Sequence, residues 1–142
     1  MNAPVAATED LIYSVEDGIA RLTFNRPQAR NAIDSALAAS LADAFSRAET
    51  ARDVQAIVVT GTDPAFCAGL DLKEFTRLGR PPEGASAVIV MAGELTKPTI
   101  GAINGAVMTG GLELALGLDL LIASERARFA DFSIVSIPAL AA

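Results

Sequence analysis

Two glycine-rich turns contain the residues of this 142-residue chain that are best suited to chemistry. They are Ala65–Lys73 (AFCAGLDLK) and Gly105–Ala115 (GAVMTGGLELA), and each follows an apolar run typical of a buried strand and opens a helix. The first N–H groups of a helix lack intrahelical partners and carry the positive end of its dipole, so they can hold a developing negative oxygen. Two such donors, one from each turn, would form an oxyanion hole. The alternative is that the glycines only allow tight strand-to-helix turns.

Glu113 is the ionisable residue of the second turn and could serve as an acid or a base. It lies three residues after Gly110, in the first turn of the expected helix, close to the N–H groups that would bind the anion. The helix dipole alone also favours a glutamate at this position, which is the competing explanation. Its neighbours are apolar, namely Leu112, Leu114 and Leu116, which predicts that the Glu113 carboxylate is buried. A buried carboxylate is normally paired with another group or has a functional role.

The composition excludes several other kinds of chemistry. The chain has no histidine, which rules out a Ser-His-Asp triad, a Cys-His dyad and a His-ligated metal, and we expect no metal site. Cys67 is the only cysteine, so no intrachain disulfide can form, and without a neighbouring base we interpret it as a packing residue. The net charge of −6 disfavours a nucleic-acid partner, and the absence of a G-x-G-x-x-G sequence disfavours a dinucleotide site.

The sequence also predicts where the protein resides. No apolar run approaches the ~18 residues needed to span a bilayer, so we expect no membrane partner. The first ten residues lack the basic and apolar regions of a secretory signal peptide. Together with the single cysteine, these features predict a cytoplasmic protein.

The elements that must position the two turns follow from hydrophobic periodicity and turn signals. Asp17-Gly18 between the alternating runs 11–16 and 19–25 predicts a β-hairpin, and Asp34 can cap a helix with an apolar stripe. The continuous run 56–60 (AIVVT) predicts a strand covered on both faces. The remaining expected elements are helices at 71–74 and 85–95 and strands at 99–104, 118–124 and 128–131. The alternation of strands and helices predicts a single α/β domain over residues 1–142.

Three motifs, in this order, resemble the enoyl-CoA hydratase/isomerase (crotonase) family. They are Phe24–Pro27 (FNRP) with Arg30–Ala32 (RNA), Ala65–Leu72 (AFCAGLDL), and Gly105–Glu113 (GAVMTGGLE). The resemblance implies an α/β architecture with the crotonase (ClpP-like) fold of repeated ββα units. It also implies acyl-CoA thioester substrates of fatty acid metabolism and lyase or isomerase chemistry, in which two backbone N–H groups stabilise a thioester enolate.

The resemblance implies a role for individual residues. The two donors would be the backbone N–H groups of Leu70 and Gly110, and Glu113 would be the catalytic acid or base. The CoA moiety would lie along four residues, Arg26, Gln28, Ala29 and Ala68. Coenzyme A is part of the substrate, so no separate cofactor is implied. A homotrimer is expected of the family, although less so of this chain.

The resemblance ends after Asp131. Hydratases of the family use a second glutamate, whose position falls near Ser133, and a hydroxyl cannot replace a carboxylate in activating water. The family's C-terminal helices, which complete the acyl pocket, have no counterpart in these residues, so we expect a fold that is incomplete at its C-terminus. A single-glutamate enzyme and a truncated chain both explain this, and the abrupt loss of similarity favours truncation. The functional alternatives are an enoyl-CoA hydratase/isomerase-like enzyme and a non-catalytic remnant or acyl-CoA-binding module.

Overall fold

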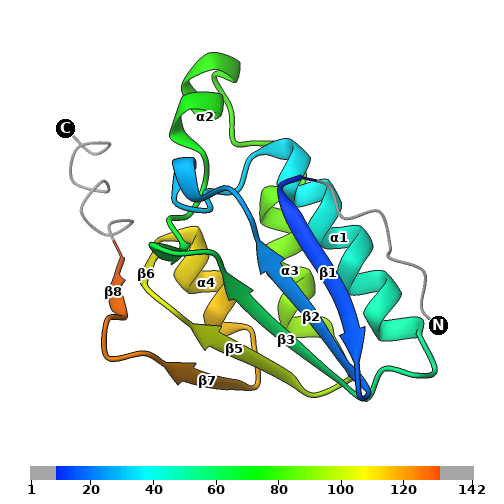
Figure 1. Ribbon diagram of the computed structural model, residues 1–142. Helices are drawn as coiled ribbons and strands as arrows, with labels where there is room; N and C mark the ends of the chain where they lie inside the picture. The colour runs from blue at the N-terminus through cyan, green and yellow to red at the C-terminus, as the bar shows by residue number, and fades with distance from the viewer. Residues whose placement is uncertain (1–8, 132–142) are drawn as a thin grey trace.

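The structure is a computed structural model that describes residues 9–131, and its elements follow a repeated ββα order (Figure 1). The strands are β1 (Leu11–Glu16), β2 (Ile19–Phe24), β3 (Ala56–Gly61), β4 (Ala65–Cys67), β5 (Thr99–Ile103), β6 (Ala106–Met108), β7 (Leu120–Ala123) and β8 (Arg128–Ala130). The helices are the short 3-10 helix η1 (Pro27–Ala29), α1 (Ser35–Thr50), α2 (Leu72–Leu78), α3 (Ala85–Glu94) and α4 (Gly110–Leu116). The α/β class and the ββα repeats predicted from the sequence are confirmed.

Five strands form the larger sheet, in the order β1-β2-β3-β5-β7. The predicted hairpin joins the antiparallel strands β1 and β2, and its turn residues Asp17 and Gly18 both have positive φ, 50° and 79°. All other neighbouring strands of this sheet are parallel. Parallel neighbours need crossover connections, and the helices α1, α3 and α4 that lie in these connections cover the same face of the sheet (Figure 1).

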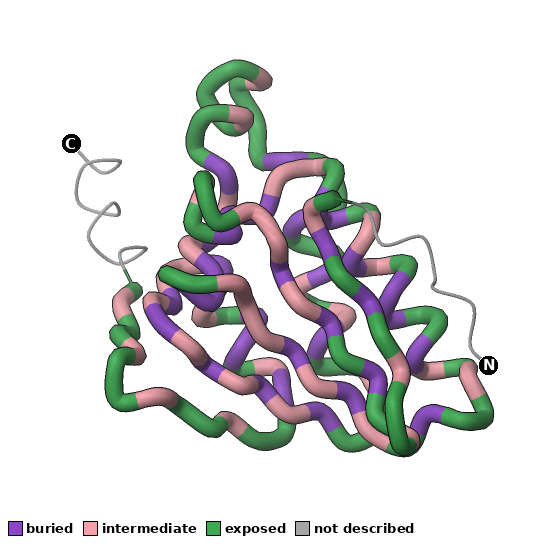
Figure 2. The backbone as a smooth tube through the Cα atoms, in the orientation of Figure 1, coloured by how far each residue is buried: buried purple, intermediate pink, exposed green. Residues whose placement is uncertain are grey.

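The other face of the larger sheet is not covered within the described residues, contrary to our prediction for the run 56–60. Ile57 and Val59 point to the helices and are fully buried, whereas Val58 and Thr60 point away and are only half-buried. Figure 2 shows the corresponding alternation of purple with pink and green along the strands. Leu120, in register with Val58 through β5, is 61% exposed on this open face. The prediction was wrong because an unbroken apolar run does not reveal that α1, α3 and α4 all lie on one side (Figure 1).

A second sheet contains three short parallel strands in the order β4-β6-β8. From β3 onward, the first strand of each ββ pair enters the larger sheet and the second strand enters this smaller one. We did not predict β4 and β6, because each lies inside a glycine-rich segment that we interpreted as a turn. These two strands lie within the first halves of the two glycine-rich segments, so the smaller sheet positions both of them.

Two aspartates cap the two helices that begin near the first glycine-rich turn. The Asp34 carboxylate accepts a hydrogen bond from Leu37 N–H at the start of α1, as the sequence predicts. The Asp71 carboxylate accepts hydrogen bonds from Lys73 and Glu74 N–H at the start of α2, which follows directly on the first glycine-rich turn. Within residues 9–131, no helix is long and apolar enough to cross a membrane.

Candidate functional site

The two glycine-rich turns lie against each other at the end of the smaller sheet. A Cβ atom built on Gly69, whose φ is +98°, would lie 3.3 Å from the Gly110 nitrogen and would overlap the Thr109 hydroxyl. A Cβ atom on Gly111 would overlap the Cys67 carbonyl, so this glycine allows α4 to approach β4 closely. The tight-turn explanation therefore accounts for Gly69 and Gly111. It does not account for Gly110, where a Cβ atom would meet only side-chain atoms, at 3.3–3.6 Å.

The N–H groups of Leu70 and Gly110 both lack a backbone acceptor among the described residues. Leu70 forms an isolated parallel bridge with Ile33, in which Ile33 N–H donates to the Gly69 carbonyl (2.7 Å) and Asp71 N–H donates to the Ile33 carbonyl (2.9 Å). These bonds use the residues on either side of Leu70 and leave its own N–H on the opposite side of the chain. Gly110 is the first residue of α4, so its N–H has no acceptor within the helix. The two N–H groups thus belong to adjoining turns, and their pairing as the donors of an oxyanion hole stays a prediction.

Glu113 lies in the first turn of α4, as predicted, but its side chain is exposed rather than buried. Leu114 and Ala115 point into the core, whereas Leu116, on the same face as Glu113 at a spacing of three residues, is 68% exposed. Leu114 and Ala115 therefore cover the opposite side of the helix, and the exposed Leu116 does not bury the carboxylate. Within residues 9–131 the Glu113 carboxylate has no hydrogen bond or ion pair, so it is available to a ligand.

Three of the four predicted CoA contacts lie near one another at the surface. Gln28 is exposed and Ala29 half-buried in η1, the short helix after β2. Ala68 N–H donates to the Arg30 carbonyl (3.0 Å), which joins the first glycine-rich turn to the end of η1. The structure thus brings the two predicted CoA-binding segments together, while the contact with CoA itself stays a prediction.

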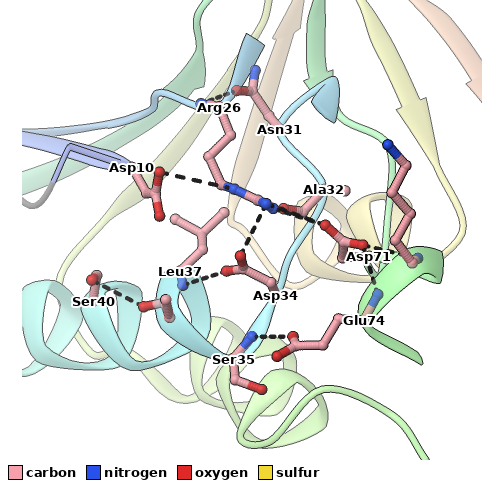
Figure 3. A network of polar contacts seen from close by, with 12 residues as sticks. Asp10, Arg26, Asn31, Ala32, Asp34, Ser35, Leu37, Ser40, Asp71 and Glu74 are labelled. Carbon is pink, nitrogen blue, oxygen red and sulfur yellow. Dashed lines mark hydrogen bonds and ion pairs between the residues drawn. The ribbon is translucent and has the colours of Figure 1, made fainter. Parts of the chain in front are cut away.

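Arg26 differs from the other predicted CoA contacts, because its side chain points inward and is only 13% exposed (Figure 3). Its guanidinium lies 2.9 Å from the Asp34 carboxylate, 3.2 Å from Asp71 and 3.9 Å from Asp10, and it donates to the Ala32 carbonyl. Burial alone would raise the pKa of Asp71, but hydrogen bonds from the N-terminus of α2 and from Arg26 hold that pKa below its ordinary value. The network indicates an internal role for this guanidinium.

Asn31 is a buried polar residue to which we assigned no role from the sequence. Its side-chain oxygen accepts from Arg26 N–H (2.8 Å), and its amide nitrogen donates to the carbonyls of Thr62 (2.9 Å) and Ala65 (2.7 Å). It adopts a φ of 57°, which asparagine tolerates better than most residues. Asn31 therefore ties the loop after β2 to the start of β4. No local sequence signal identifies this role, because the two carbonyls to which its amide donates are more than 30 residues away.

Thr109, immediately before the Gly110 donor, has a backbone conformation that is rare for a β-branched residue. Its φ and ψ are 47° and −117°, and its side chain makes no helix-capping hydrogen bond. Its N–H donates to the Ala130 carbonyl of β8 (3.0 Å), which holds the strained residue in place. Such strain costs about 1–3 kcal/mol and is typical of functional sites.

The strain at Thr109 predicts an unusual effect of a glycine substitution. Thr109→Gly should raise the free energy of unfolding by about 1 kcal/mol, because glycine adopts positive φ without a steric penalty. Thr109→Ala is the matched control, since it also removes the hydroxyl and keeps the strained Cβ. Urea denaturation of both variants tests this, and a glycine variant that is no more stable than the alanine variant would contradict it.

Cys67, in β4, is fully buried, which agrees with its interpretation as a packing residue. Burial raises the pKa of its thiol to about 12, although a hydrogen bond from Gly69 N–H acts in the opposite direction. We expect alkylation of the native protein at pH 8 to be about 10³-fold slower than alkylation in urea, because the thiolate is the reactive form. Equal rates in the two states would show that the thiol is accessible and ionised in the native fold.

Comparisons with known proteins agree with the motifs. Residues 14–135 match the family described as enoyl-CoA hydratase/isomerase. A probable peroxisomal enoyl-CoA hydratase from Arabidopsis thaliana is 40% identical over 87% of this chain, and 4-chlorobenzoyl coenzyme A dehalogenase-2 from an Arthrobacter species is 37% identical over 88% of it. The crystal structure of an enoyl-CoA hydratase from Mycobacterium avium is 51% identical, covers 89% of the chain and has a TM-score of 0.75.

The chain spans about half the length of the relatives it matches. It covers 48% of the Arabidopsis protein, 49% of the dehalogenase and 52% of the Mycobacterium avium structure. The position that the resemblance assigns to a second hydratase glutamate, near Ser133, lies outside the described residues.

Proposed function

This chain belongs to the enoyl-CoA hydratase/isomerase family, and from this premise we propose that it binds acyl-CoA thioesters and stabilises their enolates. The observation that carries the proposal is the meeting of two glycine-rich turns, each with an N–H group that has no backbone acceptor among the described residues. A thioester oxygen placed between Leu70 and Gly110 would accept a hydrogen bond from each. These bonds strengthen when the oxygen gains negative charge, which selectively stabilises the enolate and the transition state leading to it.

Glu113 is the residue that we propose to move the proton. It follows Gly110 by one helical turn, on the same helix as the second donor, and its carboxylate has no partner among the described residues. It would remove a proton from the carbon next to the thioester carbonyl, and the electron pair left behind would delocalise onto the oxygen held by the two N–H groups. The same carboxylic acid can return the proton at a more distant carbon of a dienolate, which moves the double bond without a second catalytic group.

Isomerisation of a 3-enoyl-CoA is therefore the reaction that the proposed site supports best. Hydration needs one group to position water and another to exchange a proton with carbon, whereas isomerisation needs one carboxylate and an oxyanion hole. The family name covers both reactions. By its name, the dehalogenase acts on a coenzyme A thioester, as the hydratases do, but it catalyses a different reaction.

The alternative is an acyl-CoA-binding module that carries out no reaction. The exposure of Glu113 favours this second candidate. Either function would use the acyl-CoA as the ligand, with no separate cofactor, metal or nucleic-acid partner. A cytoplasmic location stays part of the proposal, and it is supported by the single buried thiol of Cys67.

One experiment with two readouts separates these candidates. Binding of a 3-enoyl-CoA is measured by equilibrium dialysis, and double-bond migration is followed by the rise in absorbance of the conjugated enoyl thioester. Binding with migration supports the enzyme, whereas binding without migration supports the module. Failure to bind any acyl-CoA, by a chain whose circular dichroism shows it folded, would overturn both.

A further inference from the structure

The Ile33–Leu70 bridge determines where the first proposed donor lies. Because Gly69 and Asp71 both bond to Ile33, the Leu70 N–H between them can move only if this bridge moves. The bridge is isolated from both sheets, so it has no neighbouring strand pairs to hold its register. Another part of the structure must hold it in place.

The Arg26 guanidinium contacts residues on both sides of this bridge (Figure 3). On one side it binds the Ala32 carbonyl and the Asp34 carboxylate, and these residues precede and follow Ile33. On the other side both of its terminal nitrogens lie 3.2 Å from the carboxylate of Asp71, which follows Leu70. We infer that Arg26 is a positioning residue that fixes the Leu70 N–H by clamping the Ile33–Leu70 bridge, an inference that rests on the proposed function.

The charge balance shows why the clamp depends on a cation. The carboxylates of three residues, Asp10, Asp34 and Asp71, surround the single guanidinium of Arg26, whose side chain is 13% exposed. Asp34 and Asp71 also cap the helices α1 and α2. Removing the cation leaves three mutually repelling charges that solvent screens only in part. The planar fork of arginine can reach two carboxylates and a carbonyl at once, which the single ammonium group of a lysine cannot do.

This role differs from the CoA contact that the resemblance implied for Arg26. A CoA phosphate would have to compete with three carboxylates for a guanidinium that points into the protein. The two roles therefore predict different consequences of the same substitution. As a CoA ligand, Arg26 would contribute to CoA affinity, whereas as a clamp it would contribute to the geometry of the donor and to the stability of the bridge.

Hydrogen exchange followed by NMR tests the clamp without any ligand. In Arg26→Gln we expect the Ile33 and Asp71 amides to exchange about tenfold faster than in the wild type, with the β3 amide of Val59 unchanged, because only a local opening is affected. Arg77→Gln is the matched control, since it removes an exposed ion pair with Glu74 on α2. Unchanged exchange at the bridge, or an equal acceleration of all slow amides, would overturn the inference.

A second variant covers the case in which Arg26→Gln does not fold. Asp71→Asn removes the charge that faces Arg26 and keeps an oxygen that can cap α2, since asparagine caps helices about as well as aspartate. We expect the same acceleration at the Ile33 amide. The amide of the substituted residue is left out of the comparison, because its own exchange chemistry changes with the side chain. An Ile33 amide that is as protected as in the wild type would contradict the clamp.

Ligand experiments then separate the clamp from the proposed function. We expect Arg26→Gln to bind free CoA within about threefold of the wild-type affinity. When an acyl-CoA binds, we expect the variant to lose most of the change in the stretching frequency of the thioester carbonyl that binding produces in the wild type. A tenfold or greater loss of CoA affinity with an intact carbonyl shift would instead identify Arg26 as a CoA ligand. If the wild type itself shows no carbonyl shift, the proposed function fails, while hydrogen exchange still decides whether Arg26 clamps the bridge.

Discussion

Replacing Glu113 by glutamine is expected to slow isomerisation of a bound 3-enoyl-CoA by about 10²–10⁴-fold, the usual contribution of a general acid or base. Glutamine has nearly the same shape and cannot accept the proton. Because Glu113 is exposed and has no partner among the described residues, its replacement should leave the fold intact. The measurement is the rate of appearance of the conjugated enoyl thioester, at saturating substrate, with circular dichroism as the check on folding.

Glu94→Gln provides the control for the change in net charge. Glu94 is exposed at the end of α3 and has the same carboxylate, and we expect its replacement to leave the isomerisation rate unchanged. A Glu113→Gln variant as active as the Glu94→Gln variant would remove Glu113 from the mechanism. Another group would then have to carry the proton.

Replacing the Leu70 amide by an ester, with α-hydroxyisocaproic acid in place of leucine, should reduce the same rate by about 10²–10³-fold, as expected for the loss of one oxyanion-hole donor. This change removes the N–H and keeps the side chain, so it tests the donor itself. Loss of the Leu70 N–H should cost little folding stability, because this group has no backbone acceptor within the described residues. The ester also weakens the Gly69 carbonyl as the acceptor of Ile33 N–H, and the control at Leu72 matches this effect by weakening the Asp71 carbonyl that accepts from Phe75 N–H. The rate is measured as for Glu113→Gln.

The same ester at Leu72 is a closely matched control. Leu72 is the same residue type two positions later, it begins α2, and its side chain is 74% exposed. Its N–H lies outside the contact between the two turns, so we expect nearly full activity. Equal losses for the two esters would show that backbone substitution in this segment, rather than loss of a specific donor, causes the effect.

The parts of the fold that the sequence predicts well are those with a strong local pattern. The hairpin at Asp17-Gly18, the capped helix α1 and the longer strands β3 and β5 have turn chemistry or periodicity that a short window of sequence contains. Strands β4 and β6 have only three residues each, and parallel pairing with distant strands specifies them. Nothing in their local sequence could distinguish them from turns.

The candidate site was predicted in part, and the errors have a common cause. The two turns meet as expected, because a strand-to-helix turn with glycine beside a donor is visible in the sequence. Burial of Glu113 was predicted wrongly, because it depends on what covers its face of α4. The inward direction of Arg26 depends in part on Asp71, 45 residues away, and the strain at Thr109 depends on a bond to β8. These long-range contacts leave no local pattern.

The proposed function requires that the thioester oxygen of an acyl-CoA lie between the N–H groups of Leu70 and Gly110. Isotope-edited infrared spectroscopy of an acyl-CoA with a ¹³C-labelled thioester carbonyl tests it most directly, because hydrogen bonds to this oxygen weaken the C=O bond and lower its stretching frequency. We predict a lower frequency for the ligand bound to the wild-type chain than for the same ligand in water, and a smaller lowering with the Leu70 ester. A bound carbonyl at the frequency found in water, or a shift that the Leu70 ester leaves unchanged, would contradict the account.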